Sequence, residues 1–152
     1  MTRASSWTNA DGLVVGFGAN IPERNVAGVY EHNGAVKEAH LAITYQSSGA
    51  NIEIPAGSVV LDVVMDVGTA WVGGTKVELG DGNDADGWIS ATQGAVANLT
   101  AGVGIVAGGA YAIGDAATNR GLGKVYNTAD TLDVAITGTF TAGTATIVVR
   151  YI

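Results

Sequence analysis

The stretch SVVLDVVMDV, at residues 58–67, places an apolar side chain at every second position. Successive side chains of a β-strand point to opposite faces, so this period of two predicts a strand. The second face carries Asp62 and Asp66 beside valines. We therefore predict that the fully apolar face is buried, and its residues are Val59, Leu61, Val63, Met65 and Val67.

Four further stretches alternate in the same way. Turn signals rich in Gly, Asn and Ser separate them, and no window sustains a helical period for more than two turns. Short alternating strands at this spacing are typical of a sandwich or a barrel. We predict an all-β fold, a single-domain β-sandwich, with strands in KEAHLAITY (37–45), TKVEL (75–79), TLDVAITG (131–138) and GTATIVVRYI (143–152).

The first thirty residues do not follow this pattern. The segment WTNADGLVVGFGANIPERNVAG, at 7–28, has short apolar clusters and five Gly or Pro interruptions. We predict an extended N-terminal arm over residues 1–30, followed by the β-sandwich domain over 31–152. An extended arm can place apolar side chains in a groove of a partner. The candidate contact residues of the arm are Trp7, Leu13, Val14, Val15 and Phe17.

The composition is poor in charge. Charged residues make up 14% of the chain, against about 25% in a typical soluble protein, which suits a protein that hides surface in partners. The net charge is −7, so the basic footprint that nucleic-acid binding needs is absent. The chain has no cysteine, which excludes disulfides and thiolate zinc sites.

The N-terminal residues carry no apolar signal region, which predicts synthesis and use without the secretory pathway. Residues 89–114 carry no charge, but their longest stretch without polar side chains is 14 residues, shorter than the about 18 that a membrane helix needs. We expect no membrane span.

An acidic stretch, GDGNDADGW, occupies residues 80–88. An EF-hand alignment fails, because its first ligand position falls on Gly82 and its twelfth on Gln93. Two interpretations stay open. The stretch is a turn between strands, since Asp, Asn and Gly favour turn geometry, or it is a weak calcium loop of another kind that uses Asp81, Asp84 and Asp86.

No catalytic set emerges from the sequence, so we predict that the protein is not an enzyme and holds no cofactor. Asp62 and Asp66 would lie about 13 Å apart on one strand, too far for a glycosidase pair. A surface position is expected for both histidines, His32 and His40. Trp71 and Trp88 flank the acidic stretch, where indoles either pack at an edge, in the core or at a subunit interface, or form a sugar platform.

Five segments together resemble small structural proteins of tailed bacteriophages. The resemblance covers nearly the whole chain, from about Trp7 to Tyr151, and none of its motifs is catalytic. The segments are WTNADGLVVGFG (7–18), GAVKEAHLAITY (34–45), IPAGSVVLDVVMDVGTAW (54–71), VELGDGNDADGW (77–88) and GKVYNTADTLDVAITGTFTAGTATIVVRYI (123–152).

This resemblance implies a virion protein of the capsid-decoration or cement type, made in the host cytoplasm. It implies a β-sandwich or jelly roll that is often a homotrimer on the outer capsid surface. The expected partners are the major capsid protein and further copies of the chain. The bound chain would bridge neighbouring subunits of the capsid shell. The alternative is a glycan-binding head-fibre or knob module for host attachment.

Overall fold

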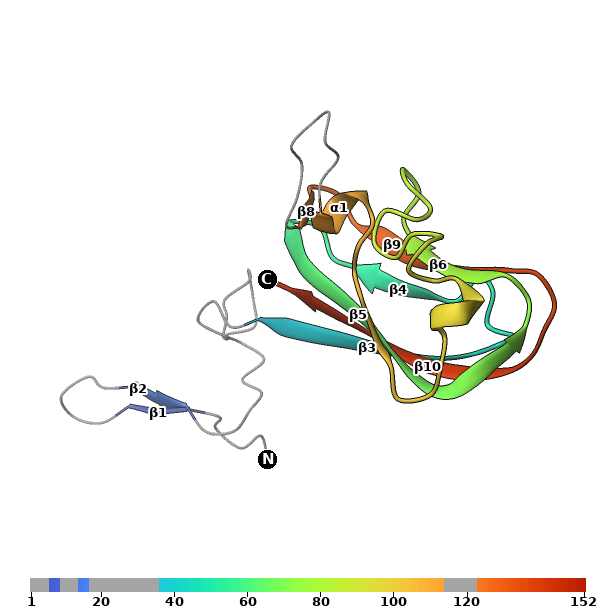
Figure 1. Cartoon of the computed structure of the whole chain (residues 1–152). Helices are drawn as coiled ribbons and strands as arrows, with labels where there is room; N and C mark the ends of the chain where they lie inside the picture. Colours follow the sequence, from blue (N-terminus) through green and yellow to red (C-terminus); the bar gives the residue numbers. More distant parts are fainter. Residues whose placement is uncertain (1–5, 9–13, 17–35, 114–122) are drawn as a thin grey trace. The chain divides into compact units, whose positions relative to one another are not determined.

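The computed structural model describes residues 6–8, 14–16, 36–113 and 123–152. The chain divides into two compact units, Met1–Val36 and Lys37–Ile152. In the first unit, strand β1 (Ser6–Thr8) pairs antiparallel with β2 (Val14–Gly16) (Figure 1). The sequence predicts an extended arm in this region, and the hairpin was not predicted.

The second unit contains two antiparallel sheets (Figure 1). The larger sheet has the order β3 (Lys37–Thr44), β10 (Phe140–Tyr151), β5 (Ser58–Gly73) and β7 (Gly104–Val106), and β8 (Lys124–Tyr126) also pairs with β5. The smaller sheet has the order β4 (Asn51–Ile54), β9 (Asp130–Thr137) and β6 (Lys76–Gly80). The prediction of an all-β, sandwich-like domain is confirmed.

Helical structure in the described residues is limited to a short α-helix, α1 (Ala110–Ile113), and a 3₁₀ turn, η3 (Val96–Asn98). None of the helices in that part of the chain has the length and apolar character that crossing a membrane requires. The strands therefore build the core.

The core lies between the inner faces of the two sheets. On β10 and β9 the buried residues are those that the alternation predicts, because every second side chain points inward. Both sheets contribute, and the residues with at most 2% exposure include Val63, Met65, Val67, Ile147 and Val149 from the larger sheet and Val77, Leu79, Leu132 and Val134 from the smaller one.

The buried face predicted for residues 58–67, which belong to β5, is wrong at its first two positions. The prediction places Val59 and Leu61 in the core, but Val60 is fully buried and Leu61 is 37% exposed. The register between β10 and β5 shifts here, because Arg150 pairs with Asp62 and the next residue, Tyr151, pairs with Val60. A β-bulge inserts one residue into a strand, so the faces exchange on its two sides.

Candidate functional site

The acidic stretch forms a tight turn directly after β6. Its first carboxylate, Asp81, is only 4% exposed. The backbone amides of Asn83 and Asp84 donate to Asp81 Oδ1 at 2.9 and 3.1 Å, and the amide of Asp81 donates to the carbonyl of Asp84 at 2.9 Å. This local pattern is the one by which aspartate stabilises a reversal of the chain.

Four distant side chains complete what we call the Asp81 network, which consists of Asp81, Trp88, Tyr111, Lys124 and Tyr126. Tyr126 donates to Asp81 Oδ2 at 2.8 Å, and Tyr111 donates to Oδ1 at 3.0 Å. Lys124 donates to Asp81 Oδ2 and, at 3.0 Å, to the hydroxyl of Tyr111. Trp88 Nε1 donates to the Tyr126 hydroxyl at 3.1 Å.

The electrostatics of the network favour an ion pair. Burial alone would raise the pKa of Asp81, but hydrogen bonds from Lys124, Tyr126 and two backbone amides hold that pKa below its ordinary value. Burial would lower the pKa of Lys124, yet Asp81 and Tyr111 raise it. Burial is also the main reason that the pKa of Tyr126 is raised. Asp81 and Lys124 therefore stay charged across the neutral range.

This arrangement is suited to anchoring chain segments. Both oxygens of Asp81 already accept hydrogen bonds from protein groups, and the ammonium of Lys124 lies 4.2 Å from the Tyr111 ring centroid and 4.9 Å from that of Tyr126. A buried charge is tolerated when it is paired and fully hydrogen-bonded. The network joins the turn after β6 to α1 and to the start of β8.

The other two acidic residues of the turn lie beside each other. The amide of Asp86 donates to Asp84 Oδ1 at 3.4 Å, and burial, together with Asp86, raises the pKa of Asp84. In the described part of the chain, no group of three His, Cys, Asp or Glu side chains is arranged to hold a metal ion. A calcium loop at Asp81, Asp84 and Asp86 stays a prediction that titration can test.

Sequence reasoning missed the partners of Asp81. They lie 30 to 45 residues farther along the chain, beyond the reach of any local motif. The one signal was the isolated basic residue Lys124 in an otherwise uncharged stretch from Gly121 to Thr128. A lone cation in such a stretch is a candidate partner for a buried carboxylate.

The two tryptophans beside the turn are core residues. Trp71 is 4% exposed and Trp88 is fully buried. Trp71 packs edge-on against Phe140, with ring centroids 5.1 Å apart, and Trp88 packs against Tyr111 at 5.5 Å. The sugar platform that the sequence left open for these two indoles is therefore not formed, because neither ring is available to a ligand at the surface.

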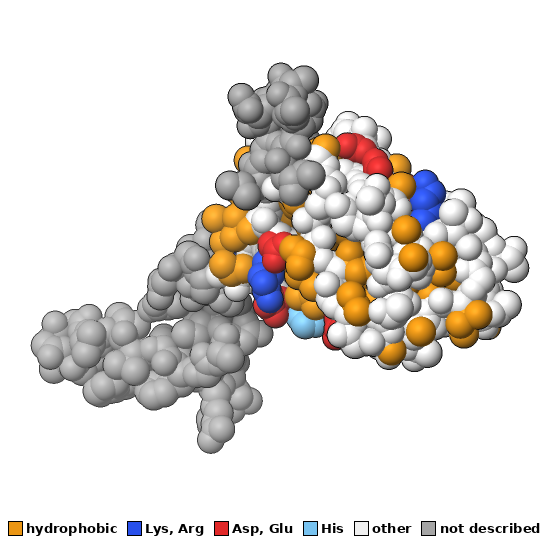
Figure 2. Space-filling view, in the orientation of Figure 1, with side chains coloured by type: hydrophobic (Ala, Val, Ile, Leu, Met, Phe, Trp, Pro, Cys, Tyr) orange, Lys and Arg blue, Asp and Glu red, His pale blue; other side chains and the backbone are white. Residues whose placement is uncertain are grey.

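The outer face of the larger sheet, which points away from the smaller sheet, carries an apolar row. Val148 of β10 pairs in register with Val64 of β5 on one side and with His40 of β3 on the other. Val64 pairs in turn with Val106 of β7, which is 61% exposed. On the face of the molecule in view, Figure 2 shows scattered apolar side chains and few charged ones.

An ion cluster lies next to this row. Arg150 donates to Glu38 Oε1 at 3.0 Å and to Asp62 Oδ2 at 3.3 Å, and His40 Nε2 lies 3.2 Å from Glu38 Oε2. Arg150 and then His40 lower the pKa of Glu38. Acidic, basic and histidine side chains also lie close together in Figure 2. Exposed ion pairs stabilise a fold little, so the cluster mainly gives this face a pattern of charge.

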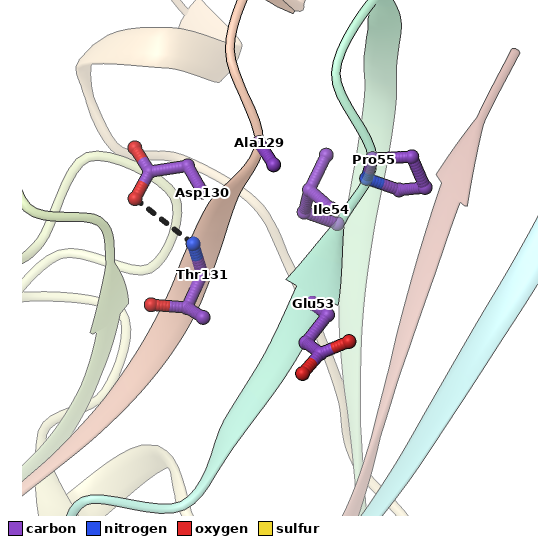
Figure 3. A pocket seen from close by; sticks show the side chains of 6 residues that line it. All are labelled: Glu53, Ile54, Pro55, Ala129, Asp130 and Thr131. Carbon is purple, nitrogen blue, oxygen red and sulfur yellow. Dashed lines mark hydrogen bonds between the residues drawn. The ribbon is translucent and has the colours of Figure 1, made fainter.

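A shallow groove of about 540 Å³ lies where β4 and β9 run side by side. Its carboxylates come from Glu53 and Asp130, and Figure 3 shows them on opposite sides without converging. Asp130 accepts a hydrogen bond from the amide of Thr131 at 2.9 Å. The groove has no pair of groups placed for acid–base chemistry. It is lined by Glu53, Ile54, Pro55, Ala129, Asp130 and Thr131.

The predicted contact residues of the arm fall in the first unit. Trp7 belongs to β1, and Val14 and Val15 belong to β2, where Trp7 and Val15 are register partners. Leu13 and Phe17 lie outside the described residues, as does His32. The role of these arm residues in binding a partner stays a prediction.

No family model matches the sequence, and no curated protein matches it. Two solved structures share its fold. A chain in the capsid of Ralstonia phage GP4 aligns with a TM-score of 0.51 and 16% identity, covering 78% of this chain and 84% of that chain. A chain in the capsid asymmetric unit of cyanophage Pam1 aligns with a TM-score of 0.51 and 18% identity, covering 88% and 96%. At this identity the likeness shows a common fold.

Proposed function

We propose that the chain is a non-enzymatic structural protein of a phage particle. The observation that supports this most strongly is the fold match to chains of two phage capsids, which extends over nearly the whole of those chains. The sequence has few charged residues, and valines are exposed on the larger sheet. Both features suit a protein that buries part of its surface against other subunits when it assembles. A fold alone does not fix a function, so the proposal needs a test on particles.

Within this class we infer a decoration or cement protein that binds the outer capsid surface and bridges neighbouring shell subunits. Its partner would be the major capsid protein, and the arm residues would contact either that protein or a neighbouring copy of the chain. The deciding experiment adds purified chain to particles that lack it and images them by cryo-electron microscopy. Ordered density on the outer shell supports the proposal, whereas density only on fibres or the tail contradicts the capsid location.

We further infer a homotrimer. Soluble oligomers are mostly closed and symmetric, and the resemblance of the sequence to phage decoration proteins favours three subunits. Light scattering of the purified chain, in solution and after release from particles, measures the assembled mass. A one-chain mass in both samples would contradict the trimer.

We also infer that the domain is a jelly roll. The strand order supports this, because one sheet has the order β3, β10, β5 and β7, with β8 also paired to β5, and the other has the order β4, β9 and β6. Beyond β6, two isolated bridges, Lys76 to Ala95 and Leu79 to Ile89, lie on the outer side of the smaller sheet. A jelly roll has eight strands in two sheets, and the two described sheets of this unit hold five and three strands.

A further inference from the structure

Strand β3 is an edge strand of the larger sheet. β3 is eight residues long, and it pairs with β10 without a register shift and contains neither Gly nor Pro. In the described part of the chain, β3 has no partner strand on its other side. A long, regular and unpaired edge is a template for another strand.

The directions in which the amides and carbonyls of β3 point follow from the hydrogen bonds between β3 and β10. The amide of Tyr45 donates to the carbonyl of Gly143 on the β10 side, and alternate residues of an antiparallel strand bond to opposite sides. The even-numbered residues therefore turn their amides and carbonyls to the free side. Thr44 uses its groups in the following turn, which leaves Glu38, His40 and Ala42 for an incoming strand.

The other sheet edges are short or covered. β4 has four residues and is followed by Pro55, and β7 and β8 have three residues each. β6 is bridged on its outer side by Ile89 and Ala95. Natural proteins protect sheet edges in such ways. Of the described edges, β3 is the long one that no other strand or bridge covers, and its protection is limited to the exposed side chains of Glu38 and His40.

The rim of the core beneath β3 is also incompletely covered. Ala39 and Leu41 point inward and pack against the core, yet both are only half-buried, as is Tyr151 of β10. An added strand would cover these side chains with its own inward-facing residues. The occupant should therefore present an apolar face to the rim and carry little charge.

The β1–β2 hairpin has these properties. Its strands are uncharged, and Trp7 and Val15 are register partners. A two-stranded sheet of this size needs a third strand or a packed face to be stable. Between the end of β2 and the start of β3 lie residues 17–36, a length of chain that spans up to about 65 Å when extended.

We propose that the β1–β2 hairpin of one chain adds to the β3 edge of a neighbouring copy and extends the larger sheet. This inference rests on the proposed homotrimer. A contact between the hairpin of one copy and the edge of the next is heterologous, and three such contacts form a closed ring when each relates its two copies by a rotation of one third of a turn. Pairing of β3 with β3 would instead join two copies. The added hairpin covers Ala39 and Leu41 and extends the outer face of the sheet.

Disulfide trapping tests the contact, because the natural chain has no cysteine. Chains with Thr8→Cys or Val14→Cys are each mixed with longer, tagged chains that carry Ala42→Cys and are then oxidised. A disulfide requires Cα atoms about 4.4–6.8 Å apart. We expect a mixed disulfide-linked dimer from at least one of the pairs. The control replaces Ala42→Cys with Glu53→Cys, at the distant β4 edge, and should give none.

A second variant blocks the edge without a chemical trap. Ala42→Pro removes an amide that faces the free side, and proline is tolerated at such edge positions. We expect Ala42→Pro to keep the melting temperature of the single domain while the assembled mass falls from three chains to one. The matched control, Ala42→Ser, should stay assembled. Both measurements are made in solution and on particles.

The outcomes separate this contact from the proposed function. If Ala42→Pro stays trimeric and no mixed disulfide forms, the trimer stands and the edge contact is wrong. If the natural chain is monomeric in both settings, the trimer itself fails. A dominant disulfide between two Ala42→Cys chains would show β3-to-β3 pairing instead. A disulfide that forms only within a chain carrying both cysteines would show that the hairpin folds onto its own domain, and either result overturns the proposal.

Discussion

The hydroxyl of Tyr126 donates to Asp81 Oδ2 at 2.8 Å and at the same time accepts the indole hydrogen of Trp88 at 3.1 Å. The hydroxyl oxygen of Tyr126 therefore links the turn after β6 of the smaller sheet to β8 of the larger sheet, 45 residues farther along the chain. Because all three groups are buried, the loss of one leaves the others without partners, and such losses are costly.

Replacing Asp81 should therefore destabilise the domain strongly. In Asp81→Ala the ammonium of Lys124 and the hydroxyls of Tyr111 and Tyr126 lose their common acceptor. Breaking a buried ion pair by removing one partner costs about 3–5 kcal/mol, and we expect a loss near the lower limit because Lys124 is partly exposed. Urea denaturation measures the free energy of unfolding. A loss below about 0.5 kcal/mol, the usual range of surface changes, would show that the network does not anchor the turn.

The same network predicts how stability depends on pH. The pKa of Asp81 in the folded chain lies below the ordinary 3.8, so the native state binds its proton less readily than the unfolded state. The stabilisation is complete above the unfolded pKa and is lost as the pH falls through 3.8 toward the lower folded pKa. We expect Asp81→Asn to flatten the decrease in the free energy of unfolding below pH 5 or so. Parallel curves for the two proteins would argue against this role.

The remaining acidic residues of the turn should matter little. Asp84→Asn combined with Asp86→Asn should change the free energy of unfolding by no more than about 0.5 kcal/mol. Calcium should leave the melting temperature of the natural chain unchanged. A rise with calcium that disappears in the double variant would revive the metal site, since a ligand that binds only the native state stabilises it.

Gly143 should tolerate no side chain. It has a φ of +142°, and a Cβ there would lie 2.4 Å from Cδ2 of Trp71. Backbone strain and overpacking each cost about 1–3 kcal/mol, so we expect Gly143→Ala to lower the free energy of unfolding by at least about 2 kcal/mol. Gly82→Ala is the matched control, because nothing lies within 4 Å of its added Cβ. Equal melting temperatures for the two variants would contradict the expectation.

Deleting residues 1–20 should leave a cooperative β-rich domain, because among the described residues those of the core all lie in the Lys37–Ile152 unit. Binding to undecorated particles or trimer stability should fall, since burying each arm side chain is worth roughly 1.5–3 kcal/mol. Circular dichroism and co-sedimentation measure the two effects. If the truncated chain unfolds, the arm is part of the core. If it binds as tightly and stays trimeric, the arm has no tethering role.

Long alternating strands could be predicted from the sequence because burial of one face imposes a period of two. The inward positions on β3, β6, β9 and β10 follow directly from that period. The bulge beside Leu61 could not be predicted, because a register shift depends on the partner strand and not on the local pattern. β4 escaped prediction for another reason: its four residues, NIEI, lie between two turn signals and are too few to show a period.

The candidate site was only partly predictable. The turn chemistry at 80–88 is local, so the composition of Asp, Asn and Gly was sufficient to indicate a reversal. The burial of Asp81 depends on Tyr111, Lys124 and Tyr126, which the topology brings together from distant segments. The burial of Trp71 and Trp88 likewise depends on which faces the two sheets present to each other. Such information is tertiary and has no short-range signature.

The Asp81 network also determines where the chain can accept foreign sequence. The amide of Gly123 donates to the carbonyl of Tyr111 at 3.0 Å, and the side chains of Tyr111 and Lys124 are held by the same carboxylate, so the base of the connection from α1 to β8 is closed. Lengthening a connection with a closed base adds only about 0.6 kcal/mol of loop entropy per doubling. A peptide inserted into this connection should therefore leave the two sheets unchanged.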